Sequence, residues 1–240
     1  MKKSVSVVIP AYNEDKTREA TVNKVDKIVK SLFYDYELLV FDDGSIDKTG
    51  RILDKLAKKS PKMRIFHNMQ NMNAGYNFRM GISKARKEYV VLLPGGDSVT
   101  ISSIKNFMKK IGDGNIVIAY VGNPKTRRVY RRIISYIVTK ALNLLFGLNV
   151  KYFFGIAAYK TELVRKVKAT SNSFALLTEI LVRMIRRGYS YVEVPMYGHK
   201  GGDSSTSAFR IRNIAGVIVT VLRLLSETYS MNAAKITHSK

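Results

Sequence analysis

The sequence contains no cysteine and no tryptophan, and it has only three histidines and five prolines in 240 residues. Without cysteine the chain forms neither a disulfide nor a thiolate metal site. The histidines, His67, His199 and His238, stand far apart, which argues against a zinc site. No uncharged apolar run approaches the length of a membrane span. Since the first apolar run begins at Val5, we expect no secretory signal.

Acidic residues are also scarce, with 18 Asp and Glu against 41 Lys and Arg, a formal net charge of +23. This excess predicts a polyanionic partner, either nucleic acid, anionic lipid headgroups or a phosphorylated substrate. We find no recognisable nucleic-acid reading helix or base-stacking motif, so we expect no nucleic-acid partner. We place the protein in the cytoplasm or, as a peripheral protein, on the cytoplasmic face of a membrane.

What the sequence does contain is a strand–helix–strand pattern over residues 4–45. Residues 5–9 and 37–41 are short apolar runs typical of buried parallel strands, and residues 16–33 carry apolar positions at helical spacing. Ligands of open parallel sheets bind beyond the carboxyl ends of the strands. The side chains that follow these two strands are Tyr12, Asn13, Glu14, Asp42 and Asp43.

The alternation of strands and helices continues along the chain, which predicts an α/β fold whose parallel sheet is covered on both faces. The expected strands are 63–67, 89–93 and 116–121, and the expected helices are 46–60, 76–85 and 102–111. A basic segment then covers 125–132. After it we expect helices at 133–146, 161–167, 174–187 and within 208–229, and strands within 153–159 and at 191–195.

Several motifs follow one another in a characteristic order. They are Val-Val-Ile-Pro-Ala-Tyr-Asn-Glu at 7–14, Val-Phe-Asp-Asp-Gly-Ser-Ile-Asp-Lys-Thr at 40–49, Asn-Ala-Gly at 73–75 followed by Gly81, Arg-Arg-Ile-Ile-Ser at 131–135, Gly-Leu at 147–148, Glu179, Gly-Tyr at 188–189, and Glu-Val-Pro at 193–195. This series resembles the inverting glycosyltransferases of family 2, which have the GT-A fold. Within that family it is similar to polyprenyl-phosphate sugar transferases such as dolichyl-phosphate mannose synthase.

The resemblance implies a Rossmann-like, mostly parallel sheet flanked by helices, with amphipathic helices at the C-terminus. It implies a transferase domain at 1–207, divided into a nucleotide-sugar half (1–122) and an acceptor half (123–207), and a membrane-associated helix and tail at 208–240. The implied reaction moves a sugar from a UDP- or GDP-linked donor to a polyprenyl phosphate at an anionic membrane surface. Transfer to a hydroxyl of a cell-surface glycan, or a non-catalytic nucleotide-binding role, stays open, as does a homo-oligomer.

The resemblance also implies which residues bind the donor: Pro10, Ala11, Tyr12, Asn13, Glu14, Asp42, Asp43, Asn73, Gly75 and Gly96. Carboxylates accept hydrogen bonds from base N–H groups and ribose hydroxyls, and a tyrosine offers a stacking face. Two adjacent carboxylates at a strand end repel each other, which favours a functional role for Asp42 and Asp43. The alternative is that residues 42–45 only form a turn and a helix start.

The chain departs from the family at the end of strand 89–93, where the usual Asp-x-Asp pair reads Pro-Gly-Gly-Asp-Ser. Asp97 is therefore the single carboxylate available there for Mg²⁺ or Mn²⁺, which take oxygen ligands from protein, water and phosphates. The alternative for Asp97 is a turn that caps the next helix. The sugar-phosphate loop near 156–158 also lacks the arginine often found there.

The implied catalytic residues are Asp97, Arg131, Glu179 and Lys200. Arg131 would hold the acceptor phosphate, or would be a charge that faces solvent or lipid. Lys200, with His199, would close over the diphosphate, or would belong to an ordinary polar loop. Glu179 would orient the acceptor, or would be a buried hydrogen-bonding residue. A phosphate acceptor needs no general base, whereas a hydroxyl acceptor would need one, and Asp97 and Glu179 are the candidates.

The segments 133–146 and 208–225 read as apolar or amphipathic helices rimmed with Arg and Lys. Such helices lie in the interface of an anionic membrane. The alternative is that they pack into the core of the protein or into a dimer interface.

Overall fold

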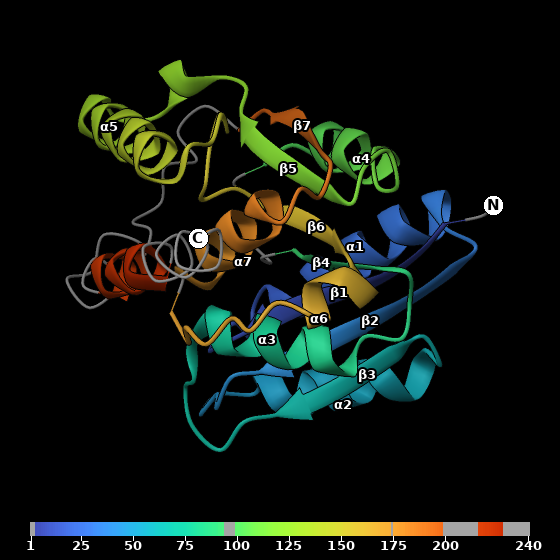
Figure 1. The fold of residues 1–240 in the computed structure, drawn as a ribbon. Helices are drawn as coiled ribbons and strands as arrows, with labels where there is room; N and C mark the ends of the chain where they lie inside the picture. Colours follow the sequence, from blue (N-terminus) through green and yellow to red (C-terminus); the bar gives the residue numbers. More distant parts are fainter. Residues whose placement is uncertain (1–2, 94–98, 174, 199–215, 228–240) are drawn as a thin grey trace.

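The computed structural model describes residues 3–93, 99–173, 175–198 and 216–227. These residues form a sheet with the strand order β3-β2-β1-β4-β6-β5-β7 (Figure 1). The strands are β1 (Ser4–Ala11), β2 (Asp35–Asp42), β3 (Met63–His67), β4 (Tyr89–Leu92), β5 (Ile116–Val121), β6 (Ala157–Lys160) and β7 (Tyr191–Met196). One sheet therefore contains strands from both predicted halves of the transferase domain.

The sheet is mostly parallel, as expected. β1 pairs in parallel with β2 and β4, β2 with β3, and β5 with β7. The antiparallel strand β6 lies between β4 and β5, a position that the sequence did not predict. β6 is also shorter than the predicted 153–159. The chain passes so close to β5 at Gly155 that an added Cβ there would lie 2.0 Å from the Ala119 carbonyl oxygen.

The helices follow the predicted order. They are α1 (Arg18–Leu32), α2 (Thr49–Lys59), α3 (Asn73–Lys84), α4 (Ile101–Lys109), α5 (Val129–Phe146), α6 (Thr161–Arg165) and α7 (Ala175–Arg186), with a 3₁₀ turn, η1 (Pro124–Thr126), before α5. Residues 216–227 form a further helix, here called the C-terminal helix. α3 and α5 begin a few residues earlier than predicted. No helix within the described ranges is long and apolar enough to cross a bilayer.

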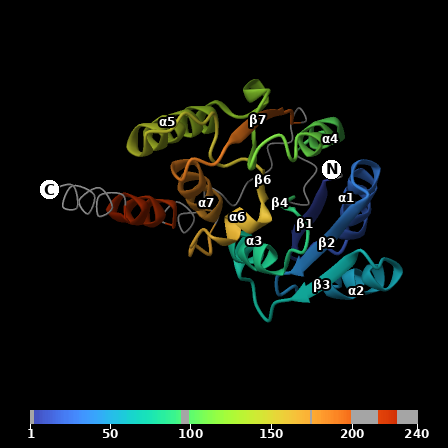
Figure 2. The same ribbon diagram turned by 45° about the vertical axis from the view of Figure 1, so that its right-hand side comes forward.

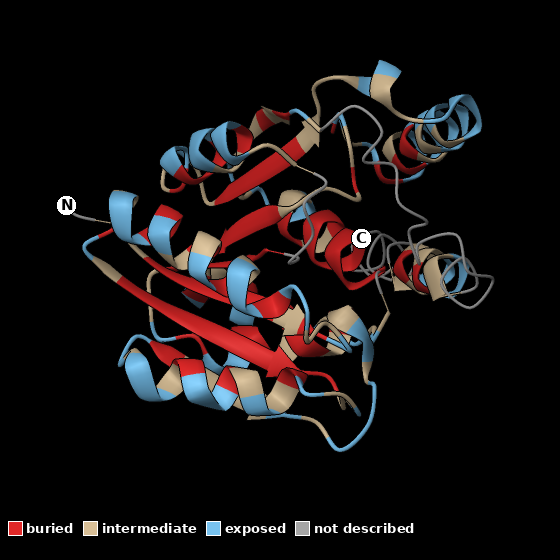
Figure 3. Cartoon of the chain, turned by 180° about the vertical axis from the view of Figure 1, so that it is seen from behind, coloured by how far each residue is buried: buried red, intermediate tan, exposed pale blue. Residues whose placement is uncertain are grey.

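Alternate residues of each strand face opposite sides of the sheet, and both sides are covered. Val7 and Val40 belong to a core cluster with α1, α2 and α4, and Val8 and Leu39 to a second cluster with α3, α5, α6 and α7. Leu224 of the C-terminal helix joins the second cluster. Figures 2 and 3 show these layers and the buried sheet between them.

The parallel strands all end at one edge of the sheet. Consequently the segments that follow β1, β2, β3, β4, β5 and β7 leave the sheet at that edge. Every predicted site residue except Glu179 lies at the end of one of these strands or in the segment that follows it. The topology therefore assembles the candidate site at the edge where ligands of parallel sheets bind.

Candidate functional site

The loops that follow β1 and β2 are joined by hydrogen bonds. The Asp43 N–H donates to the Ala11 carbonyl at 2.8 Å. The Asn13 N–H donates to Ser45 Oγ at 3.1 Å, and Asn13 Oδ1 accepts from the Ile46 N–H at 3.0 Å. Asn13 has a φ of 51°, a left-handed conformation that asparagine tolerates better than most residues. The first two sequence motifs thus form one double loop.

Asp43 connects this double loop to the third motif. Its carboxylate accepts from the N–H groups of Met72 and Asn73, at 2.8 and 2.9 Å, and from Asn68 Nδ2 at 2.8 Å. Because these backbone N–H groups form the amino end of α3, the helix dipole also favours the negative charge. Asp43 is 3% exposed. These contacts explain how a buried carboxylate next to Asp42 is stabilised.

Asp42 is held by a different set of donors. Its Oδ2 lies 2.9 Å from Nδ1 of His67, and its Oδ1 accepts from the Ser45 N–H at 3.1 Å. The other ring nitrogen of His67 lies 3.1 Å from Oδ1 of Asp54. Burial lowers the pKa of His67, but its hydrogen bonds to Asp42 and Asp54 outweigh that effect and raise the pKa above the ordinary value. The histidine therefore bridges two carboxylates.

Glu14 pairs with Arg18, the first residue of α1. Arg18 is 1% exposed, and burial lowers its pKa to about 10. The Glu14 N–H donates to Thr49 Oγ1 at 2.8 Å, which ties the β1 loop to the start of α2. Pro10 and Ala11 are the last residues of β1, opposite Phe41 and Asp42. Tyr12 has the most exposed of these aromatic or acidic side chains, at 46%.

Asn73 and Gly75 lie in the first turn of α3. Asn73 has a φ of 72°, and an added Cβ at Gly75 would lie 2.1 Å from the Ser173 carbonyl oxygen. Glycine is therefore required at position 75 by the close approach of the segment before α7. The structure thus gathers the predicted donor-binding residues of the first three motifs around one pair of loops and one helix end.

Gly96, Asp97, His199 and Lys200 lie outside the described residues. The chain on either side of them is described. The Leu93 N–H donates to the Val8 carbonyl at 2.9 Å, and Val99 forms an isolated antiparallel bridge with Gly198. Asn123 holds Gly198 through two hydrogen bonds of 2.9 Å. The segment that carries Asp97 therefore ends, and the segment that carries Lys200 begins, at neighbouring points of the backbone.

Arg131 lies in the first turn of α5, which begins shortly after β5. Burial and the nearby Arg127 charge lower the pKa of Arg131. Arg127 itself donates to the Tyr152 hydroxyl at 3.2 Å. The basic segment is thus concentrated at the carboxyl end of β5, on the side of the sheet edge away from the donor loops of β1 and β2.

Glu179 lies in α7 and is 0% exposed. Its carboxylate oxygens are taken by protein donors: the N–H groups of Thr170 and Ser171, and the guanidinium groups of Arg183 and Arg223. These contacts favour the interpretation of Glu179 as a buried hydrogen-bonding residue.

A divalent metal would need oxygen ligands near the diphosphate. Within the described ranges there is no group of three or more His, Asp or Glu side chains that would hold a metal ion. The carboxylates of Asp42 and Asp43 are occupied by the donors described above and do not supply such a site. Asp97 remains the predicted metal ligand.

Three residues of this site were not predicted from the sequence. His67 and Asn68 hold Asp42 and Asp43 from the end of β3, and Arg18 pairs with Glu14. The four-residue spacing of Glu14 and Arg18 at a helix start was a usable signal. The contacts of His67 and Asn68 required knowledge of the pairing of β2 with β3.

We compared the sequence and the fold with those of known proteins. The model of the family "Glycosyl transferase family 2" matches residues 6–168. A glycosyltransferase, GlyG, from Streptococcus pneumoniae is 31% identical over 120 residues, 49% of this chain, and the alignment covers 39% of that protein. The chain therefore spans well under half of the length of this relative.

Two other proteins match over nearly the whole chain. An undecaprenyl-phosphate 4-deoxy-4-formamido-L-arabinose transferase from Photorhabdus laumondii is 26% identical over 242 residues, covering 96% of this chain and 73% of its own. The crystal structure of glucosyl-3-phosphoglycerate synthase from Mycobacterium tuberculosis, in complex with Mg²⁺ and uridine diphosphate, has a TM-score of 0.68 at 16% identity and covers 92% of this chain and 79% of its own. The latter likeness confirms the GT-A fold. The chain belongs to glycosyl transferase family 2.

Proposed function

We propose that the protein transfers a sugar from a UDP- or GDP-linked donor to a polyprenyl phosphate, as a peripheral protein on the cytoplasmic face of a membrane. The donor would bind at the loops of β1 and β2, with Tyr12 exposed for stacking and Glu14, Asp42 and Asp43 forming the acidic lining. The M. tuberculosis neighbour that shares the fold was crystallised with uridine diphosphate, which supports a nucleotide-linked donor.

The observation that supports a lipid as the acceptor is the exposed surface of α5. Of its 18 residues only Thr139, Leu142 and Phe146 are buried. Large apolar side chains are exposed along the helix: Val129, Tyr130, Ile133, Ile134, Tyr136, Ile137, Leu144 and Leu145. Figure 3 shows this helix as largely exposed. A contiguous exposed apolar patch of this kind marks an interaction site.

The charge around α5 indicates which surface it contacts. No Asp or Glu occurs between Asp113 and Glu162, whereas Lys and Arg recur through 125–140. The C-terminal helix, on the same side of the molecule in Figures 1 and 2, also exposes Ile218, Val219 and Leu222. Apolar side chains between cations suit the interface of an anionic membrane. A lipid phosphate at that interface would lie near the basic segment.

Different residues of this chain would then have different roles in the reaction. Arg131 would bind and orient the acceptor phosphate, whose oxygen attacks the anomeric carbon as the bond to the diphosphate breaks. Because that phosphate is already an anion near pH 7, no side chain has to remove a proton. Lys200 would neutralise charge on the leaving diphosphate. A bound Mg²⁺ or Mn²⁺, with Asp97 as its protein ligand, would supply further neutralisation.

The test is an acceptor screen with UDP- and GDP-linked sugars. Undecaprenyl phosphate in vesicles and a soluble glycan with free hydroxyls are offered in parallel, and products are identified by mass spectrometry. We expect a glycosyl-phosphate lipid and no glycan product. Transfer to the glycan alone would identify the hydroxyl-acceptor alternative, and nucleotide binding without turnover on either acceptor would identify a non-catalytic relative.

Removal of divalent cations tests the metal assignment. We expect EDTA to abolish transfer and added Mn²⁺ or Mg²⁺ to restore it, because one carboxylate ligand and the diphosphate would share the ion. Asp97→Asn would lower kcat by on the order of 100-fold, comparable with the loss of one electrostatic contact in a transition state. Full activity in EDTA would show that cationic side chains alone neutralise the diphosphate.

A further inference from the structure

Glu179 connects α7 with the segment that precedes it and with the C-terminal helix. Its Oε2 accepts from the N–H groups of Thr170 and Ser171, at 3.2 and 3.0 Å. Its Oε1 lies 3.1 Å from a guanidinium nitrogen of Arg183, one turn further along α7, and 3.1 Å from one of Arg223. The buried charge is therefore paired and hydrogen-bonded on both oxygens, as a buried carboxylate requires.

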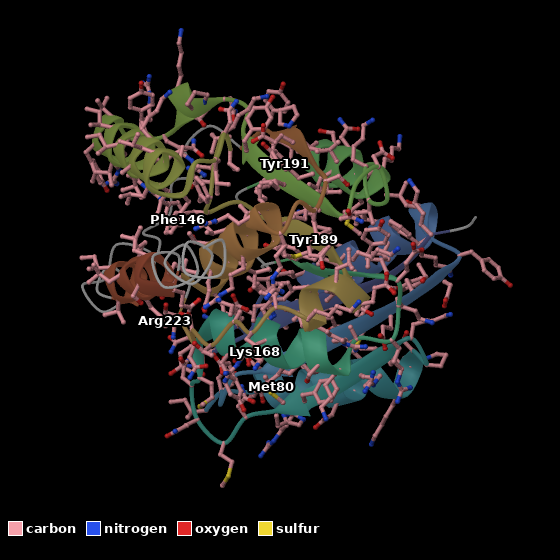
Figure 4. The ribbon with its side chains drawn as sticks, in the orientation of Figure 1. Met80, Phe146, Lys168, Tyr189, Tyr191 and Arg223 are labelled. Carbon is pink, nitrogen blue, oxygen red and sulfur yellow. The ribbon has the colours of Figure 1, made fainter. Side chains whose placement is uncertain are left out.

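The C-terminal helix is held by this group of residues. Arg183 binds the Glu227 carboxylate through two contacts of 2.5 and 2.9 Å. Arg223, labelled in Figure 4, pairs with Glu179 and donates to the Thr170 hydroxyl. Thr220 and Leu224 of the C-terminal helix are buried. Two arginine–carboxylate pairs thus dock the C-terminal helix on α7 and on the segment 170–173.

Ser173 is confined between two glycines. An added Cβ at Gly75 of α3 would lie 2.1 Å from the Ser173 carbonyl oxygen, and one at Gly216 of the C-terminal helix would lie 2.8 Å from Ser173 Oγ. The Ser171 hydroxyl lies 3.0 Å from the Ser173 hydroxyl. We therefore expect a shift of the C-terminal helix or of Ser171 to displace Ser173, which packs against the first turn of α3. Closely packed segments of this kind transmit displacement because they are not compressible.

The first turn of α3 is also where Asp43 binds. The Asn73 N–H, two residues before Gly75, donates to Asp43 Oδ2 at 2.9 Å. A continuous series of contacts therefore runs from the C-terminal helix through Arg223, Glu179 and Ser173 to the carboxylate assigned to the donor.

We propose that Glu179 is a positioning residue for the donor site, and that the docked C-terminal helix is the element it uses to fix the amino end of α3 around Asp43. This inference rests on the proposed function, because it takes the loops of β1 and β2 as the nucleotide site. It gives the C-terminal helix two roles: its outer side chains contact the membrane, and its inner side chains set donor affinity.

Isothermal titration of UDP and GDP, each with Mg²⁺ and without acceptor, tests the proposal. Glu179→Gln keeps the shape of the side chain but removes the charge that both arginines face. Arg223→Gln removes the contact from the other side, and its place on the outermost helix keeps it a usable variant if Glu179→Gln does not fold. The matched control is Ser226→Ala, an exposed residue of the same helix whose hydroxyl donates to the Arg223 carbonyl.

We expect the nucleotide Kd to rise roughly 2- to 30-fold in Glu179→Gln and in Arg223→Gln. The double variant should resemble the single ones, because the two residues act through one group of contacts. Ser226→Ala should bind nucleotide like the wild type. In turnover, the donor KM should rise while kcat is retained.

Two results would overturn the proposal, and they are distinguishable. If the wild type binds neither nucleotide, the proposed function is wrong and the inference fails with it. If the wild type binds a nucleotide and the folded variants bind it with the same Kd, the function stands and the positioning role of Glu179 is wrong.

Discussion

Asp43 illustrates how single residues decide the geometry of the site. Its carboxylate collects two backbone N–H groups and one amide nitrogen, so it stabilises the amino end of α3 whether or not a ligand is present. Asparagine at this position would keep one acceptor oxygen and turn an NH₂ group toward donors. The buried N–H groups that lose their acceptor then determine how much stability the substitution removes.

We therefore expect Asp43→Asn to lower the free energy of unfolding by about 1–3 kcal/mol. Urea denaturation measures this change. Asp113→Asn is the control, since Asp113 is a surface carboxylate outside the donor loops, paired with Lys3 and Lys110. Equal stability of the Asp43 variant and the wild type would show that the α3 contacts contribute little.

His67 predicts a pH dependence of stability. Its pKa is raised in the folded protein, from an ordinary value of 6.5, because its hydrogen bonds to Asp42 and Asp54 outweigh the effect of burial. The folded state thus binds the proton more tightly than the unfolded state. The resulting stabilisation is complete below pH 6.5 and is lost as the pH rises through the folded pKa.

Accordingly, the stability difference between the wild type and His67→Asn should be larger at pH 6 than at pH 9. Chemical denaturation at both values measures it. A difference that is independent of pH would mean that the pKa of His67 is the same in the folded and unfolded states, so that its contacts with Asp42 and Asp54 do not favour the protonated ring.

Among the elements, α3 shows why glycine is needed at one helical position. Alanine normally stabilises an exposed helix interior by about 1 kcal/mol relative to glycine. At Gly75 the new methyl group would meet the Ser173 backbone. We expect Gly75→Ala to be destabilising by roughly 1–3 kcal/mol, the usual cost of overpacking.

Thermal and urea unfolding check this prediction. Gly114→Ala serves as the comparison, because an added Cβ there would lie 3.3 Å from the Ile116 carbonyl oxygen, a much smaller overlap than the 2.1 Å approach at Gly75. A Gly75→Ala variant as stable as the wild type would show that the segment 168–173 moves aside freely.

The elements also show what the sequence could predict. Apolar runs predicted the strands, and for β3 and β5 the predicted bounds agree with the structure. The start of α3 was placed three residues late, because its amino end is stabilised by Asp43, thirty positions away in sequence. The direction of β6 was not predictable, because the strand has only four residues and no local pattern states which strands it pairs with.

Contacts between residues distant in sequence also limited what could be predicted about the site. The motifs predicted which residues bind the donor, because each motif follows its own strand. They did not reveal that Glu179 pairs with Arg223 and that Arg183 pairs with Glu227. Those pairs join residues 44 positions apart through tertiary packing, which no local pattern encodes.

For the whole molecule, the exposed apolar face of α5 predicts reversible binding to anionic vesicles. Each nearby Lys or Arg contributes about 1 kcal/mol at such a surface, and salt weakens that contribution. Flotation with phosphatidylglycerol vesicles should therefore recover the protein at low salt and less of it at high salt. Neutral vesicles should recover little.

Ile133→Glu combined with Ile137→Glu should abolish this binding, because both side chains are more than half exposed. The control, Lys58→Ala with Lys59→Ala in the last turn of α2, changes the net charge by the same amount. If both double variants float equally well, total charge rather than the α5 face determines attachment.

The position of the antiparallel strand β6 also has a consequence for folding during translation. Residues 4–92 supply β3, β2, β1 and β4, which pair with one another without help from later segments. β5, although it emerges from the ribosome next, has no partner until residues 157–160 and then β7 are translated. A nascent chain halted when the residues up to about 130 have left the ribosome should therefore protect the amides of the first four strands from hydrogen exchange, while those of β5 still exchange freely.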